Sequence, residues 1–231
     1  MGKRQVRISC NSNKEHIVED EIMEWEEYIN EIELIEKQNN VEHDLYCVIA
    51  PLLKSIKNFK EYSIRDVDNR KRTNTTKNER TFWGIKGFPD FAILDRTYEA
   101  SSKNDKDKVY GVVEAKFIGK PMLSKPGDKL QLIGHLLSFG KVIYTNAYEW
   151  RIYENGWKVS KEIIFDKEND SYEARSDSVD DKEKWKEINL WLKSFSLDEL
   201  TYTSFVLKDA SGWNKSQWDA LLNSLEKLNM N

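Results

Sequence analysis

Two acidic residues and one lysine lie beside or within apolar segments of the sequence. Asp90 follows Pro89 at the start of one segment, and Glu114 and Lys116 lie inside a second segment, residues 112–118. Because side chains alternate along a strand, Glu114 and Lys116 should project from the same face. Charges among apolar neighbours are costly to bury unless they are compensated, and a hydrated divalent cation shared with Asp90 would compensate them.

These residue types suit the hydrolysis of a phosphodiester bond. The carboxylates of Asp90 and Glu114, with the backbone carbonyl of Ala115, are hard oxygen ligands of the kind that Mg²⁺ prefers, with Mn²⁺ as a substitute. A bound cation lowers the pKa of a coordinated water and polarises phosphate oxygens. Lys116 would orient or deprotonate that water and offset developing negative charge. We therefore expect a metal-dependent nuclease.

The same residues form a pattern that resembles a known signature. Pro89-Asp90, a variable gap and then Glu114-x-Lys116 resemble the motif of the PD-(D/E)xK nuclease superfamily, whose members share a restriction-endonuclease-like fold. Gln131, fifteen residues after Lys116, opens a segment that resembles the Gln-x-x-x-Tyr helix of many members, with histidine at position 135 in place of tyrosine. The resemblance implies that Gln131 supports the site.

Flanking segments extend the resemblance to the N-terminal nuclease domain of type I restriction enzyme motor subunits, over roughly residues 39–160. The helix expected from Val41 looks like the opening helix of that group, and residues 144–153 look like its closing strand pair. Members commonly carry a glutamate on the opening helix, and Glu42 is the best match. The chain has no Gly-x-x-x-x-Gly-Lys-Ser/Thr stretch, so we expect no ATP-driven motor.

Each site residue also has a simpler interpretation. Asp90 could start a strand after a proline, and Glu42 could be a first-turn acid favoured by the helix dipole. Glu114 and Lys116 could form a solvated pair on an edge strand, although their apolar neighbours disfavour this. His135 could steady the site or contact nucleic acid. The agreement of several signals in order and spacing favours the active site.

The elements that must position these residues alternate between helical and extended patterns. Helices are expected over residues 18–32, from Val41, over Leu130–Phe139 and twice after Lys184; strands are expected over Phe88–Leu94, Val109–Ile118, Lys141–Thr145, Tyr148–Glu154 and Trp157–Val159. Asn155-Gly156 predicts a hairpin between the last two strands, and Pro51 predicts a kink or a break. This order predicts an α/β (α+β) fold, a mixed central sheet flanked by helices, with helical additions at both ends.

We expect three parts along the chain: an acidic N-terminal helical arm over residues 1–38, a nuclease-like core over 39–165, and a polar loop with C-terminal helices over 166–231, packed on the core. The apolar stripe of the arm has three interpretations. It packs on the core, which we favour, or it forms a two-fold interface. In the third, the acidic arm covers a basic groove as a nucleic-acid mimic.

Charge is unevenly distributed along the 231 residues, although the net charge is only −4. Residues 15–44 carry twelve acidic residues and one basic residue, whereas residues 51–89 carry ten basic and four acidic residues. The basic stretch is either a solvated face or a surface that contacts the phosphates of nucleic acid. The candidates for nucleic-acid contact are Arg70, Lys71, Arg72, Lys77, Arg80 and Lys86, together with His135.

Composition is that of a soluble globular protein, which we expect in the cytoplasm. A mean hydropathy of −0.72, without an apolar run near twenty residues, argues against a membrane span. Cys10 and Cys47 alone cannot build a disulfide framework or a zinc site. We expect DNA as the substrate and allow for a homodimer. The alternatives are an RNA-directed nuclease and a non-catalytic binding module on the same fold.

Overall fold

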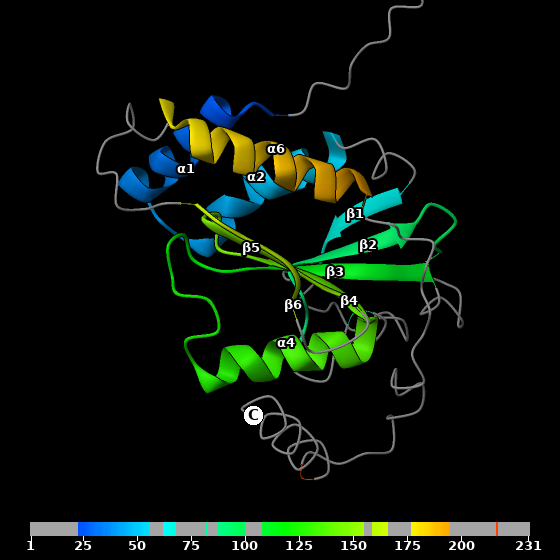
Figure 1. Ribbon diagram of the computed structural model, residues 1–231. Helices are drawn as coiled ribbons and strands as arrows, with labels where there is room; N and C mark the ends of the chain where they lie inside the picture. The colour runs from blue at the N-terminus through cyan, green and yellow to red at the C-terminus, as the bar shows by residue number, and fades with distance from the viewer. Residues whose placement is uncertain are drawn as a thin grey trace, which may run out of the picture.

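The computed structural model describes residues 23–55, 62–67, 82, 87–99, 108–154, 159–165, 177–194 and 216. Most of them build one mixed sheet with helices on both faces (Figure 1). In chain order the elements are α1 (Trp25–Gln38), α2 (Glu42–Ser55), β1 (Tyr62–Asp66), β2 (Phe91–Asp95), β3 (Val109–Ala115), α4 (Pro126–Phe139), β4 (Lys141–Thr145), β5 (Glu149–Glu154), β6 (Val159–Ile164) and α6 (Val179–Ser194).

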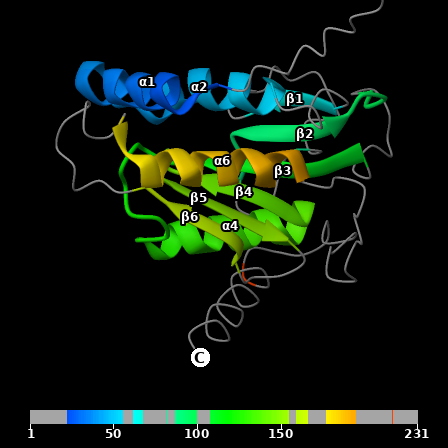
Figure 2. The same cartoon turned by 45° about the horizontal axis from the view of Figure 1, so that its top comes forward.

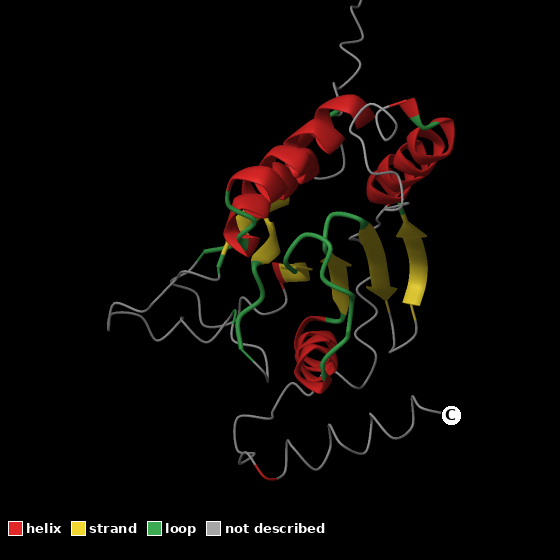
Figure 3. Ribbon diagram, turned by 90° about the vertical axis from the view of Figure 1, so that its left-hand side faces the viewer, coloured by secondary structure: helices red, strands yellow, loops and turns green. Residues whose placement is uncertain are grey.

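The six strands lie in the sheet in the order in which they occur along the chain. β3 and β4 are parallel and are connected through α4, whereas every other neighbouring pair is antiparallel. Helices α1, α2 and α6 cover one face of the sheet and α4 covers the other (Figures 1 and 3). This arrangement confirms the predicted α+β class with a mixed central sheet.

Successive side chains of the strands point alternately into two apolar layers, one on each face of the sheet. In β3, Val113 and Ala115 belong to the layer beneath α1, α2 and α6, whereas Val112 belongs to the layer beneath α4. Helix α4 contributes Leu132, Leu136 and Phe139 to the second layer. Glu114, which lies between Val113 and Ala115, therefore projects toward α4.

Helix α1 packs on the sheet through its apolar stripe, as we favoured from the sequence. Trp25, Ile29 and Ile32 are all buried, and the Tyr28 hydroxyl donates a hydrogen bond of 2.7 Å to the carbonyl of Ala147. In Figure 2, α1 and α2 follow one another in a row on the face of the sheet that α6 also covers. Since the described part of the stripe is covered by its own chain, that part does not offer a two-fold interface.

Aromatic rings join α1, α6 and the end of β6. Trp185 of α6 stacks on Tyr28 with a centroid distance of 4.1 Å, and Phe165 lies 4.7 Å from Trp25. We expect Trp185→Ala to lower the free energy of unfolding by about 3–5 kcal/mol, because it leaves a cavity in this cluster. Urea unfolding measures the loss. Leu190→Ala on the same helix is the control; it removes a side chain that is 63% exposed and should change stability by at most about 0.5 kcal/mol.

Two element predictions were wrong. The sequence predicts no strand before Phe88, but Tyr62–Asp66 form strand β1, a short edge strand whose only buried side chain is Ile64. We extended the polar loop to Lys184, but α6 begins at Val179, where the Ser178 hydroxyl accepts a hydrogen bond from the backbone of Asp181. A cap of this kind, with acids in the first turn, starts a helix in a segment that lacks apolar periodicity.

The remaining element predictions have mixed outcomes. Helix α2 continues through Pro51 to Ser55, so the break that we allowed for at Pro51 does not occur, and a kink there stays a prediction. β5 and β6 pair antiparallel, as the hairpin prediction required, but β6 continues to Ile164, beyond the predicted end at Val159. Residues 155–158 lie outside the described part. The N-terminal segment 1–22 and most of the final predicted helix also lie outside it. No helix of the described residues is long and apolar enough to span a bilayer.

Candidate active site

Adjacent strands bring Asp90, Glu114 and Lys116 together. Asp90 immediately precedes β2, Glu114 is the penultimate residue of β3, and Lys116 follows the end of β3. Because β2 and β3 are antiparallel neighbours, the start of one lies beside the end of the other. The Asp90 backbone N–H donates a hydrogen bond of 3.1 Å to the carbonyl of Val113, which fixes this juxtaposition.

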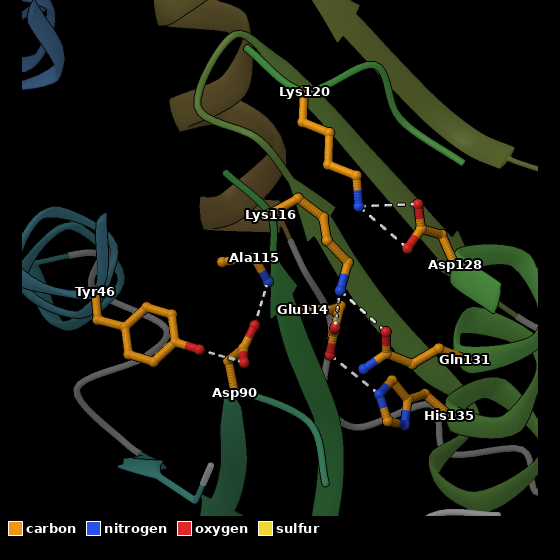
Figure 4. Close-up of polar contacts among 9 residues, drawn as sticks. All are labelled: Tyr46, Asp90, Glu114, Ala115, Lys116, Lys120, Asp128, Gln131 and His135. Carbon is orange, nitrogen blue, oxygen red and sulfur yellow. Dashed lines mark hydrogen bonds and ion pairs between the residues drawn. The ribbon is translucent and has the colours of Figure 1, made fainter. Parts of the chain in front are cut away.

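Each carboxylate contacts two protein groups (Figure 4). The Tyr46 hydroxyl donates to Oδ1 of Asp90, and the backbone N–H of Ala115 donates to Oδ2 over 2.6 Å. Nζ of Lys116 donates to Oε1 of Glu114, and Nε2 of His135 lies 3.1 Å from Oε2. Both acids are therefore held at both oxygens.

Helix α4 contributes Gln131 and His135 to the site, on the side opposite α2. Gln131 Oε1 accepts a hydrogen bond of 3.0 Å from Nζ of Lys116, and His135 lies one helical turn later on the same face. The ammonium of Lys116 also lies 5.9 Å from the ring centroid of Tyr144 on β4. Glu114, Gln131 and the Tyr144 ring thus surround one amino group.

The loop between β3 and α4 is tied to the sheet and to the helix. The Lys116 backbone N–H donates to the carbonyl of Thr145 over 2.8 Å, and the Asn146 side chain donates to the carbonyl of Lys120 over 2.6 Å. The ammonium of Lys120 lies 3.0 Å from Oδ2 of Asp128 in the first turn of α4. The main chain that carries Lys116 is therefore anchored on both sides.

Burial makes the charges of the site interact strongly. Asp90, Glu114 and Lys116 are only 4%, 1% and 7% exposed. Burial and the neighbouring charge of Glu114 raise the pKa of Asp90 well above its usual 3.8, and Glu42 adds to this, although hydrogen bonds from Tyr46 and Ala115 oppose it. The protein thus places Asp90 where a second acid and a low dielectric both disfavour its charge.

The same surroundings favour the charged form of Lys116, although they disfavour the charged form of Asp90. Burial by itself would lower the pKa of its ammonium, but the charge and hydrogen bond of Glu114 outweigh burial. The charges of Glu42 and Asp90 act in the same direction, so the pKa of Lys116 is raised. In the metal-free protein this lysine is a proton donor rather than a base.

The raised pKa of Asp90 predicts a pH-dependent stability. The folded protein holds the Asp90 proton more tightly than the unfolded chain does, so Asp90 destabilises the metal-free fold increasingly as the pH rises from its unfolded pKa through its raised folded pKa. We expect Asp90→Asn to gain on the order of 1–3 kcal/mol at pH 8 and less at pH 5, by urea unfolding in chelator. An asparagine amide can donate to the Tyr46 hydroxyl and accept from the Ala115 N–H.

Asp95, at the other end of β2, provides a control of opposite sign. Hydrogen bonds from Tyr110 and Thr97 lower the pKa of Asp95. Asp95→Asn should therefore reduce stability at pH 8, and the reduction should fade as the pH falls through the lowered pKa. Loss of stability at pH 8 in Asp90→Asn would contradict the burial and charge repulsion that we assign to Asp90.

The donor set fits a divalent cation held through few protein ligands. In the described part of the chain, no group of three or more His, Cys, Asp and Glu side chains is arranged to hold a metal. Mg²⁺, however, is commonly bound through one or two carboxylates, with water and substrate phosphates completing its shell. Asp90 and Glu114 supply that pair, and the repulsion between them is the kind that a cation relieves.

The structure brings most of the predicted site residues together. Asp90, Glu114, Lys116 and Gln131 are joined by the contacts above. Glu42, half-buried in the first turn of α2, lies near enough for its charge to raise the pKa of Asp90 and of Lys116. The peptide of Ala115 contacts Asp90 through its N–H, while a role for its carbonyl as a metal ligand stays a prediction.

Predictions of nucleic-acid contact fare differently. His135 is 0% exposed and contacts Glu114, which agrees with the alternative that it steadies the site, while contact of His135 with nucleic acid stays a prediction. Its position on the buried face of α4, among Leu132 and Leu136, is the physical reason for its burial. The basic candidates lie outside the described residues: Arg70, Lys71, Arg72, Lys77, Arg80 and Lys86.

Sequence reasoning missed Tyr46. Its hydroxyl reaches Asp90 from α2, on the face of the sheet opposite α4. The available signal was its position four residues after Glu42, which places both side chains on one face of the helix.

Comparisons with known proteins add little to this geometry. No protein-family model matches the chain, and no curated protein matches it. Among solved structures, a cryo-electron-microscopy structure of a DrdV–DNA complex matches with a TM-score of 0.43 and 11% sequence identity, over 74% of this chain and 14% of that chain. The present chain thus spans a small part of that protein, and so low a TM-score supports no conclusion about function.

Proposed function

We propose that this protein is a metal-dependent nuclease that hydrolyses phosphodiester bonds of DNA at the Asp90–Glu114–Lys116 site. The observation that carries the proposal is the placement of the Lys116 ammonium between Glu114 and Gln131, beside a buried acid from the neighbouring strand. A buried cluster of two acids and one lysine is expensive to maintain for stability alone. Residues of this kind suit phosphodiester hydrolysis.

Each side chain has a role that its contacts support. A divalent cation held by Asp90 and Glu114 would supply an activated water and would polarise the phosphate. Lys116, protonated in the metal-free protein, would donate a hydrogen bond to the attacking water or to the phosphate oxygens as negative charge develops. Gln131 would keep that ammonium directed, because its side-chain oxygen accepts from Nζ.

One observation favours a second candidate, a non-catalytic binding module. All four carboxylate oxygens of Asp90 and Glu114 already contact a protein group, so the pair is satisfied without a cation. In such a module, the charged cluster would only fix the relation between the sheet, α2 and α4. The charge repulsion that raises the pKa of Asp90 argues for the nuclease instead.

A cleavage panel tests the proposal. Supercoiled plasmid, linear duplex, single-stranded DNA and RNA are incubated with the full chain in Mg²⁺, in Mn²⁺ and in chelator. We expect cleavage of DNA that requires the metal. Cleavage confined to RNA would correct the substrate and keep the site, whereas a protein that leaves all four substrates intact would favour the binding module.

A further inference from the structure

Two side chains hold the paired acids from opposite faces of the sheet (Figure 4). Tyr46 projects from α2 and donates to Oδ1 of Asp90, and His135 projects from α4 and meets Oε2 of Glu114 at 3.1 Å. Both are deeply buried, at 6% and 0% exposure, and the Tyr46 hydroxyl and Nε2 of His135 are each engaged by one of the two acids. Their contacts with the acids therefore call for a role inside the protein.

The second oxygen of each acid is held by a group close to the strand itself. Ala115 N–H engages Oδ2 of Asp90, and Lys116 Nζ engages Oε1 of Glu114. A carboxylate that is held at only one oxygen can still turn about its terminal bond. Tyr46 and His135 remove that remaining freedom, so the two acids keep one relative orientation despite their mutual repulsion.

The surroundings of His135 indicate which ring nitrogen carries the proton. Nδ1 is buried and has no hydrogen-bond partner among the described residues. A bare lone pair at Nδ1 costs less than a buried N–H without an acceptor. The ring with its proton on Nε2 is therefore favoured, and it donates to Glu114.

We infer that Tyr46 and His135 are paired positioning residues, which orient Asp90 and Glu114 for a divalent cation before it binds. The inference rests on the proposed function, because it assigns the cation to those two acids. Hydrogen-bond partners behind metal ligands typically change metal affinity or activity by about 10- to 100-fold when they are removed. Neither residue needs to touch the substrate for this effect.

Calorimetric binding of Mn²⁺ to the full chain, without nucleic acid, tests the inference. We expect Tyr46→Phe and His135→Leu each to weaken Mn²⁺ binding by about 10-fold or more. His135→Gln places an amide donor near the position of Nε2, so it should stay within about 3-fold of the wild type. Tyr28→Phe is the matched control, because it removes another buried hydroxyl, which donates to Ala147 in the layer beneath α1. It should leave Mn²⁺ affinity unchanged, whatever it does to stability.

The outcomes separate this inference from the proposed function. If the wild type binds Mn²⁺ and Tyr46→Phe and His135→Leu bind it equally well, the positioning role is overturned while the nuclease stands. If His135→Gln loses as much affinity as His135→Leu, donation from His135 is overturned. If the wild type binds no Mn²⁺, both proposals fall. Thermal unfolding of each variant identifies any that fails to fold; if His135→Leu is one of them, the near-isosteric Tyr46→Phe decides the positioning role.

Discussion

Replacing Lys116 by alanine is expected to lower metal-dependent DNA cleavage by about 10²- to 10³-fold, the usual cost of losing one donor that stabilises developing charge. The ammonium of Lys116 is directed by Glu114 and Gln131, so no other described group donates at the same point. The effect should fall on kcat, because the lysine would act more strongly on the transition state than on bound substrate. Single-turnover cleavage with saturating enzyme measures it.

Lys120 is the matched control for this substitution. It lies on the same loop, but its ammonium pairs with Asp128 at 3.0 Å rather than with the site acids. We expect Lys120→Ala to change the cleavage rate by less than about 10-fold, since exposed or half-exposed ion pairs contribute little. Equal losses in both variants would show that general charge near α4, rather than the placement of Lys116, supports cleavage.

The second large effect is expected from Glu114→Gln. The amide keeps the shape of the side chain but removes its charge, so Mn²⁺ affinity should fall by about 100-fold or more and cleavage should fall with it. Mn²⁺ calorimetry and the cleavage rate, measured on the same preparation, check both effects.

Glu33 provides a comparison on α1. It is a buried glutamate that accepts a hydrogen bond of 3.1 Å from Lys37. Glu33→Gln should leave Mn²⁺ affinity and the cleavage rate unchanged. Wild-type Mn²⁺ affinity in Glu114→Gln would remove Glu114 from the metal site and leave it a structural partner of Lys116.

The sequence predicts the fold class and most of the elements, and it also predicts which residues lie together in the candidate site. Asp90, Glu114 and Lys116 could be placed together because strand alternation and adjacency are local rules. Gln131 followed from the resemblance to a known helix. Tyr46 was not found, because its contact with Asp90 joins α2 to β2 across the face of the sheet, and nothing local specifies such a contact.

His135 and β1 show which features the sequence alone does not decide. A histidine on an apolar helix face has the same local pattern whether it is buried or reaches a ligand, and only the packing of α4 on β3 and β4 decides. β1 pairs with β2 at the edge of the sheet and buries only Ile64, so its sequence carries almost no alternation. Both outcomes depend on tertiary contacts.

The most direct measurement of the central claim is anomalous diffraction from crystals of the full chain grown with Mn²⁺. We expect one strong peak bonded to carboxylate oxygens of both Asp90 and Glu114, at about 2.0–2.1 Å for an ion of the Mg²⁺ type. Lys116 should remain within reach of the metal-bound water. A Mn²⁺ ion bound elsewhere, with neither Asp90 nor Glu114 among its ligands in a protein that still cleaves DNA, would contradict the site that we propose.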